Sequence, residues 1–349
     1  MSNFPNPSPS GHLLALGAGG LIGLKLLQRR NRADLTGQAA LITGGSRGLG
    51  LELARELGAH GCKLAICARD RAELDRAAAE LGDAGYDVFA EVCDVSDNDA
   101  VTAFVRNVEA HYGQIDLLIT NAGEMQVGPV HELSVADFER IMSIDFFGTL
   151  YPIMAVLPGM RDRKAGRIAL ITSIGGRIAT PHLLTYDAAK FATVGLGEGL
   201  AAELSRDGIV VTTVVPGLMR TGSHIQARFT GGEEQREADF AWFATGASAP
   251  TSPPADKAAR TVVDAIRRGK LEVTFPWPFA LVSRLHGLAP GTTIRVMQMA
   301  EALLPNRPPS PGETAATEQG EPIEERSDSP TLHVVTKLGR DAEIDFNQT

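Results

Sequence analysis

The sequence predicts an α/β fold: a doubly wound, mostly parallel sheet with helices on both faces. Short apolar runs and helical patterns alternate along the chain from Gln38 onward. The runs are largely continuous, which is typical of strands that are covered on both faces by helical layers. Strands are expected at 39–43, 62–68, 86–92, 115–120, 167–172 and 209–215, with a last strand at 271–275. Helices are expected at 48–60, 71–84, 98–112, 135–160 and 185–206.

Two helix starts carry the pattern of a capping box. Ser134 is followed three residues later by Asp137, and Ser96 by Asp99. A serine at the N-cap and an acidic residue three positions on can each bond a free backbone N–H of the first turn. The pattern therefore predicts that helices begin after Ser134 and after Ser96.

The composition is that of an ordinary globular protein. Of 349 residues, 44% are hydrophobic and 21% are charged, which suits a chain that buries a sizeable core. The net charge of −9 argues against a nucleic-acid partner, because such proteins present a basic face to the phosphates. The cysteines Cys62, Cys67 and Cys93 are odd in number and lack metal-type spacing. We therefore expect no metal site and no disulfide framework, and a reducing, cytoplasmic setting.

Two extensions flank the expected domain. Residues 1–35 form an N-terminal extension, and the domain covers 36–304. Residues 305–349 are rich in Pro, Glu, Ser and Thr, and we expect this tail to be disordered. Within the domain, 228–256 is expected to form a loop or short helices over a pocket. The apolar, proline-broken stretch from Phe275 suggests contact with a membrane or a partner.

The N-terminal extension contains an apolar segment that suggests membrane contact. The uncharged run 13–24 is shorter than the roughly 20 residues of a free membrane span, and Lys25 follows it directly. The basic cluster at 29–32 would keep the domain after it in the cytoplasm. Residues 11–32 are thus expected to anchor the chain to a membrane or lie on its surface, or else to pack on the protein or a partner. A cleaved signal peptide fits less well.

A glycine-rich turn follows the first expected strand. The stretch TGGSRGLG begins at Thr43, with Gly44, Gly48 and Gly50 in the turn and the first helical turn. Glycine lets the backbone approach a pyrophosphate, and the helix N-terminus offers free N–H groups. Between a strand and a helix, at the start of a parallel α/β pattern, this turn indicates a Rossmann-type dinucleotide site.

The end of the second strand favours NADP over NAD. An NAD site usually has an acidic residue there for the ribose hydroxyls, whereas this chain has Ala68 followed by Arg69. Arg47 lies inside the glycine turn, so two guanidinium groups could bind a 2′-phosphate. Asp70 is an argument against this interpretation, and the alternative is that both arginines are solvated surface groups.

Three further residues suggest proton transfer. Ser173 follows the strand at 167–172, and Tyr186 and Lys190 are four residues apart on the next expected helix, so they share one face. A nearby ammonium lowers the pKa of a tyrosine toward neutral pH. Ser173 can donate a hydrogen bond to a substrate oxygen. The alternative, an exposed helix pair, is less consistent with the serine and the glycine turn upstream.

These motifs together resemble the short-chain dehydrogenase/reductase family over residues 36–275. The resemblance rests on TGGSRGLG at 43–50, NAG at 121–123, Ser173, YDAAK at 186–190 and PGLMRT at 216–221. It implies a catalytic role for Ser173, Tyr186 and Lys190. It also implies a cofactor site formed by Gly44, Ser46, Arg47, Gly48, Leu49, Gly50, Arg69, Asp94, Val95, Asn121, Ala122, Gly123, Tyr186, Lys190, Pro216, Gly217 and Thr221.

One position departs from the family pattern. Where the family usually has Asn-x-x-Gly, this chain has DFFG, so Asp145 takes the asparagine position in the catalytic set. In the family, the backbone carbonyl of that residue helps hold a water linked to the lysine, and this role could survive the change. A buried carboxylate near Lys190 would partly offset its charge and weaken its pull on the Tyr186 pKa.

The resemblance implies an NADP(H)-dependent oxidoreductase that transfers a hydride between the nicotinamide and a carbonyl or alcohol carbon. Tyr186 would exchange the oxygen's proton, Ser173 would polarise that oxygen, and Lys190 would hold the ribose. The pocket is expected to be apolar and to take a hydrophobic small molecule, and a homo-oligomer is expected. The residues expected to border it are Met125, His182, Leu183, Leu184, Met219 and the cluster 240–243. A non-catalytic NADP-binding or scaffold protein is the alternative.

Overall fold

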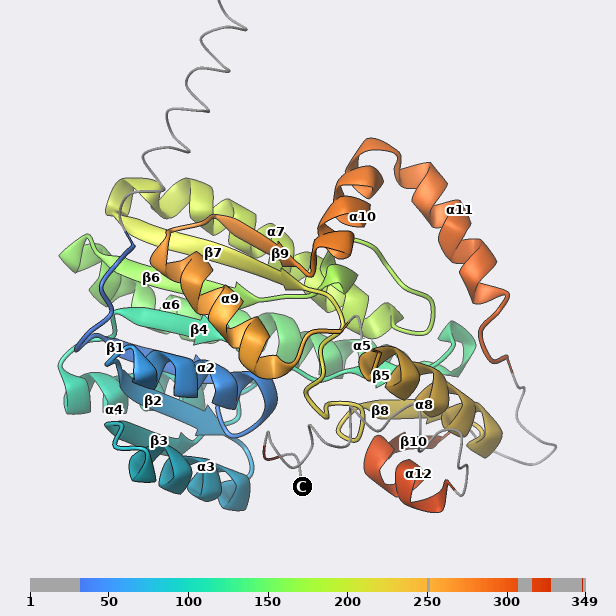
Figure 1. The fold of residues 1–349 in the computed structure, drawn as a ribbon, viewed down its shortest axis with the longest axis horizontal. Helices are drawn as coiled ribbons and strands as arrows, with labels where there is room; N and C mark the ends of the chain where they lie inside the picture. The colour runs from blue at the N-terminus through green and yellow to red at the C-terminus, as the bar shows by residue number, and fades with distance from the viewer. Residues whose placement is uncertain (1–31, 250–251, 307–315, 328–346, 348–349) are drawn as a thin grey trace, which may run out of the picture.

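The computed structural model describes residues 32–249, 252–306, 316–327 and 347, and a seven-stranded parallel sheet forms its centre (Figure 1). The strand order is β3-β2-β1-β4-β6-β7-β9. The strands are β1 (Ala39–Thr43), β2 (Lys63–Ala68), β3 (Val88–Val92), β4 (Leu117–Thr120), β6 (Gly166–Ile171), β7 (Ile209–Pro216) and β9 (Glu272–Phe275). The predicted doubly wound α/β class is confirmed, and the ends of the seven strands differ from the predicted ranges by at most two residues.

Helices cover both faces of this sheet. One face packs against α2 (Gly48–Ala59), α3 (Arg71–Asp83) and α9 (Ala255–Arg267). The other packs against α4 (Asn98–Tyr112), α6 (Gly148–Arg163) and α7 (Leu184–Glu203). Each layer forms its own apolar core, and the central strands β1 and β4 are fully buried. Because all seven strands are parallel, their carboxyl ends lie at one edge of the sheet, where the loops that follow them gather.

The two predicted capping boxes have different outcomes. At α5 (Val135–Ile141), Ser134 and Asp137 form the predicted reciprocal pair. At α4, the prediction for Ser96 is wrong, because Asp97 is the N-cap and accepts bonds from the N–H groups of the first turn. The Ser96 side chain instead donates to Asp94 at 2.7 Å. A carboxylate one residue closer to the helix therefore takes the capping role.

The helix that begins with α5 continues into α6 through one π-helical turn, Met142–Phe147. The whole stretch, Val135–Arg163, is long and apolar enough to cross a membrane by length and composition. It packs against the central sheet instead, and its π-helical turn carries Asp145 into the interior. A wide turn of this kind re-aims a side chain within an otherwise regular helix.

A second, smaller sheet covers the carboxyl edge of the first. It contains β5 (Gln126–Val127), β8 (Arg228–Gly231) and β10 (Ala316–Gln319), in the order β10-β8-β5. A regular helix, α8 (Glu233–Ala247), lies where the sequence predicted only a loop or short helices. The expected disordered tail is also wrong for 316–327, because β10 pairs antiparallel with β8 and is followed by α12 (Gly320–Arg326). The buried Ile323 of α12 joins the apolar core under this sheet.

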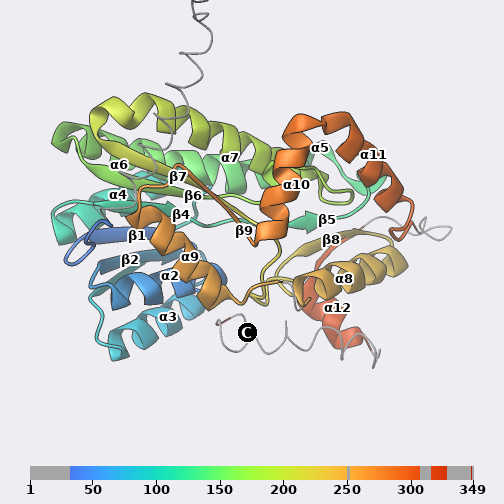
Figure 2. The same cartoon turned by 45° about the horizontal axis from the view of Figure 1, so that its top comes forward.

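The last two helices of the main domain form a hairpin that extends away from the sheet (Figure 2). They are α10 (Trp277–Leu288) and α11 (Pro290–Glu301), which contact each other, and α10 also contacts β9. Neither helix contains a buried residue. The expected membrane segment at 11–32 lies outside the described residues except for Arg32, which forms an ion pair with Asp264 at 3.1 Å.

Candidate active site

A cavity of about 980 Å³ opens at the carboxyl edge of the central sheet. Loops after β1, β2, β4, β6 and β7 form one side, and α8, α10 and the β10–α12 segment close the other. Nearly all of the site residues expected from the sequence line it. The exceptions are Gly50 and Asp145, which lie directly behind its wall. The sequence thus identified the lining of one cavity from segments that are far apart along the chain.

The glycine turn has the close backbone packing that a pyrophosphate site needs. Gly44 and Gly48 adopt φ values of +65° and +55°, a backbone region that residues with a Cβ rarely occupy. A Cβ on Gly50 would lie 2.0 Å from the carbonyl oxygen of Gly44. Asn121 secures the same turn, since its Nδ2 donates to the carbonyls of Thr43 and Gly44 at 3.2 and 3.0 Å.

The N-terminus of α2 is open toward a ligand. Its N-cap, Arg47, forms no side-chain cap, and no acidic residue occupies the first turn. The N–H groups and the positive end of the helix dipole are therefore free of an internal carboxylate. This chemistry fits the phosphates of a dinucleotide.

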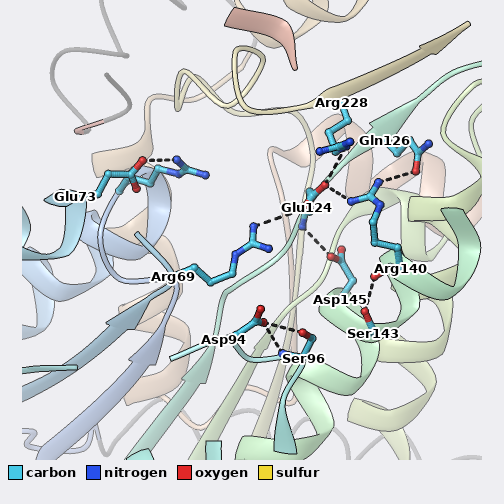
Figure 3. Close-up of polar contacts among 11 residues, drawn as sticks. Arg69, Glu73, Asp94, Ser96, Glu124, Gln126, Arg140, Ser143, Asp145 and Arg228 are labelled. Atoms are coloured by element: carbon cyan, nitrogen blue, oxygen red, sulfur yellow. Dashed lines mark hydrogen bonds and ion pairs between the residues drawn. The ribbon is translucent and has the colours of Figure 1, made fainter. Parts of the chain in front are cut away.

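Both arginines of the expected 2′-phosphate site line the cavity, and each faces a carboxylate. Arg47 Nη1 lies 2.7 Å from Glu73 Oε1, and Arg69 Nη2 lies 3.5 Å from Glu124 Oε2 (Figure 3). Asp70, the main argument against NADP, is the N-cap of α3 and accepts a bond from the Glu73 N–H at 2.8 Å. Its carboxylate is therefore already engaged in capping.

Ser173, Tyr186 and Lys190 come together at the centre of the cavity wall. Ser173 lies two residues after the end of β6, and Tyr186 lies in the first turn of α7, one turn before Lys190. The Lys190 Nζ is 5.4 Å from the centroid of the Tyr186 ring. The Ser173 Oγ accepts a bond from the Gly175 N–H at 3.1 Å, and its hydroxyl also forms a side-chain hydrogen bond with Tyr186.

Asp145 holds Lys190 from behind. Its Oδ2 lies 3.1 Å from the Lys190 Nζ, and its Oδ1 accepts a bond from the Glu124 N–H at 2.8 Å. The side chain of Asp145 is fully buried and that of Lys190 nearly so. The backbone carbonyl of Asp145 accepts bonds from the hydroxyls of Thr149 and Thr193, at 2.9 and 3.3 Å. Asp145 therefore takes part in the site through its side chain, which pairs with Lys190, as well as through its backbone carbonyl.

Burial and this ion pair determine the acidities at the site. Burial raises the pKa of Asp145, although Lys190 opposes the shift. Burial alone would lower the pKa of Lys190, but the charges of Asp145 and Tyr186 outweigh it, so the lysine pKa is raised. Burial also raises the pKa of Tyr186, and Lys190 offsets this only in part while Asp145 adds to it. The pKa of Tyr186 is therefore raised in the structure, whereas the sequence analysis expected it to be lowered.

The sequence analysis missed two carboxyl groups in the cavity wall. Glu124, directly after the NAG segment, is shared by three arginines: Arg140 in a short contact, Arg69 at 3.5 Å and Arg228 at 3.7 Å (Figure 3). The position of Glu124 beside NAG was a signal, but its partners come from distant segments.

The second of these groups is Asp187, directly after Tyr186. Its Oδ2 accepts a bond from the Thr180 N–H at 2.5 Å, while its Oδ1 has no hydrogen-bond partner among the described residues. Burial raises the pKa of Asp187 to about 8. This carboxyl group therefore ties the loop before α7 to the first turn of that helix.

Some of the residues expected to border the substrate side line the cavity, together with the polar residues Gln226, Gln319 and Glu321. Met125, Leu183, Met219, Trp242 and Phe243 line it.

The other residues expected there do not line the cavity. His182 is buried with its Nδ1 2.8 Å from the Asp239 carboxylate, so the partner from α8 explains its position. Leu184 points to solvent, and Phe240 packs in the core against Phe229. A helical α8 directs alternate sides of the 240–243 cluster to the core and to the cavity.

Known proteins resemble this chain in sequence and in fold. Residues 38–230 match the family model for short chain dehydrogenases. The chain is 31% identical over 291 residues to the mouse protein dehydrogenase/reductase SDR family member 7B, covering 81% of this chain and 88% of that protein. It is 34% identical over 263 residues to an Anopheles gambiae SDR family protein 7-like, covering 72% and 80%. A Burkholderia phymatum short chain dehydrogenase/reductase solved with NAD shares the fold, with a TM-score of 0.69, 22% identity and coverage of 80% and 99%.

Proposed function

Because this chain belongs to the short-chain dehydrogenase/reductase family, an oxidoreductase family that uses a nicotinamide cofactor, we propose that it interconverts a carbonyl and an alcohol with NADP(H) on a hydrophobic small molecule. The observation that carries the proposal is the meeting of Ser173, Tyr186 and Lys190 in the cavity that the glycine turn also lines. Carbonyl reduction is the favoured direction.

A nicotinamide cofactor held by the glycine turn at Gly44 and Gly48 would supply or accept the hydride at the substrate carbon. Tyr186 donates the proton to the carbonyl oxygen during reduction, and its raised pKa keeps it protonated at neutral pH. Ser173, which lies beside Tyr186, donates its hydroxyl hydrogen to the same oxygen. Lys190, kept charged by its raised pKa, stabilises the phenolate that Tyr186 becomes, while Asp145 holds the ammonium in place.

Substitution of Tyr186 tests the chemical step. Tyr186→Phe keeps the ring and removes only the acid, so turnover should fall to background while the cofactor still binds. Turnover of a carbonyl panel is followed by NADPH absorbance, and cofactor binding by titration. Turnover near the wild-type rate would show that another group supplies the proton.

The preference for NADP rests on Arg47 and Arg69, with Ala68 at the end of β2 and Asp70 engaged as a cap. A 2′-phosphate brings more negative charge than a single carboxylate, so it would compete with Glu73 and Glu124 for the two arginines. NADPH should bind more tightly than NADH, and Arg69→Ala should weaken NADPH by about tenfold or more while leaving NADH nearly unchanged. Equal affinities in the wild type would contradict this preference.

The non-catalytic alternative has one observation in its favour. Asp145 adds to the raised pKa of Tyr186 and shares the charge of Lys190, both of which slow formation of a phenolate. If the protein binds NADPH but leaves every carbonyl in the panel unreduced, a binding or scaffold role replaces the enzymatic one.

The domain limits, 36–304, the membrane tether at 11–32, the cytoplasmic location and the homo-oligomer belong to the same proposal. Ala33 exchanges hydrogen bonds with Arg267, so a chain shortened to begin at Ala33 keeps its attachment to α9. That shortened chain should lose the membrane association that persists in high salt, and it should keep reductase activity. Full-length protein that stays soluble in fractionation without detergent would contradict the tether, and sedimentation of the full chain tests the oligomer.

A further inference from the structure

We propose that the α10–α11 hairpin docks on an anionic lipid surface and inserts the exposed apolar stripes of both helices at the level of the headgroups. The hairpin lies outside the candidate active site apart from the base of α10. The proposal goes beyond the reductase function and does not depend on it, because its test reads lipid contact and not turnover.

One face of α10 is apolar and exposed along its full length. Trp277, Leu281, Leu285 and Leu288 follow at intervals of four, four and three residues, which places them on one side of a helix. Their exposed fractions are 75%, 48%, 50% and 83%. Amphipathic helices of soluble proteins turn such a stripe toward the core, whereas α10 turns it outward.

The partner helix repeats this arrangement. Val296 and Met299 of α11, and Leu303 two residues after its end, are spaced by three and four residues and are all exposed. The two helices extend away from the sheet in both views of the fold (Figures 1 and 2). The rest of the described chain leaves both apolar stripes exposed.

The charge of the hairpin favours a lipid surface over a second copy of the chain as the partner that covers the apolar stripes. The one carboxylate of the two helices is Glu301, the last residue of α11, while Arg284 and Arg295 are exposed within them, in a chain of net charge −9. A symmetric dimer through this surface would bring the same cationic patch against itself. An anionic bilayer instead attracts each arginine and takes up the apolar stripe, and Trp277 is a residue type enriched at membrane interfaces.

The length of the helices determines how they would sit. Each has 12 residues, or about 18 Å at 1.5 Å per residue, which is too short for a hydrocarbon core of about 30 Å. They would therefore lie in the interface. Phe279, in the first turn of α10, lines the cavity beside Gly217, where a Cβ would come within 2.3 Å of its ring. Docking would thus place the cavity close to the lipid.

Trp277 allows a direct test on the full-length protein. The chain has two tryptophans, and the other, Trp242, lines the cavity. The protein is mixed with phosphatidylserine vesicles that contain brominated phosphatidylcholine, which quenches tryptophan fluorescence on contact. We expect quenching in the wild type, none of that component in Trp277→Phe, and weaker quenching in high salt.

Matched leucine substitutions locate the contact. Leu285→Glu should raise the lipid concentration for half-maximal quenching about tenfold, because it places a charge where a leucine would insert. Leu271→Glu makes the same exchange at a residue 59% exposed outside the hairpin and should change nothing. Leu288→Glu, at the most exposed position of α10, repeats the test with the least risk to folding, and circular dichroism verifies each variant.

Three outcomes would overturn the proposal. Absence of Trp277 quenching in the wild type removes lipid contact at the hairpin, even if the protein binds vesicles through another segment. Equal quenching in the Leu285→Glu and Leu271→Glu variants removes the apolar stripe as its cause. If Leu285→Glu instead dissociates an oligomer in sedimentation without lipid and Trp277 is unquenched in the wild type, the hairpin is a subunit interface.

Discussion

The buried ion pair between Lys190 and Asp145 makes a strong prediction about stability. The Asp145 side chain is fully buried, and besides pairing with Lys190 it accepts a hydrogen bond from the Glu124 N–H. Lys190→Met would leave this carboxylate without its cation, at a cost of about 3–5 kcal/mol in the free energy of unfolding. This corresponds to a fall in Tm of roughly 6–20 °C. Asp145→Asn in the same chain should recover most of the loss.

Urea and thermal unfolding of the two single variants and the double variant measure this coupling. Lys257→Met, at an exposed lysine, is the control and should stay within about 0.5 kcal/mol of the wild type. The loss in Lys190→Met should grow with pH, because a buried carboxyl with a raised pKa favours the folded state only while it is protonated. The reasoning fails if the double variant is no more stable than Lys190→Met alone.

Three further predictions concern the same cavity. Gly50→Ala should weaken NADPH binding more than tenfold in titrations and destabilise the fold by about 1–3 kcal/mol, because the new Cβ would lie 2.0 Å from the carbonyl oxygen of Gly44. Gly82→Ala is the control and should be harmless, because its Cβ would meet nothing within 4 Å. Asp187→Asn should abolish a loss of stability, on the order of a few kcal/mol, that the wild type undergoes as pH rises from about 4 to 8; parallel pH-dependent curves would refute it. Asp145→Asn should lower the pKa of Tyr186 by removing a charge that raises it, so alcohol oxidation should set in at lower pH in a rate profile, and an unshifted profile would count against the electrostatic coupling.

The central sheet and the lining of the cavity could be predicted because the sequence patterns that indicate them are local. Continuous apolar runs identify buried strands, and the carboxyl ends of parallel strands meet at one edge, so residues after each strand gather there. Ser173 and the glycine turn were found in this way. Tyr186 and Lys190 were found from their spacing on one helix.

The features that sequence missed depend on distant partners. His182 looked like a pocket or surface residue because its partner, Asp239, comes 57 residues later on α8. The short polar strand β10 has no apolar pattern of its own and exists through its pairing with β8. The direction of the Tyr186 pKa also escaped prediction, since burial outweighs the attraction of Lys190 and follows from packing around the whole cavity.

The place of β10 in the chain has a consequence for synthesis on the ribosome. Strands β1 to β9 are complete once residue 275 has emerged, so the parallel sheet and the glycine turn can form while translation continues. Gln319 and Glu321, which line the cavity beside β10 and α12, emerge more than forty residues later. The nascent protein therefore has its dinucleotide fold before it has a finished substrate wall, and the emergence of β10 and α12 determines when the enclosed cavity first exists.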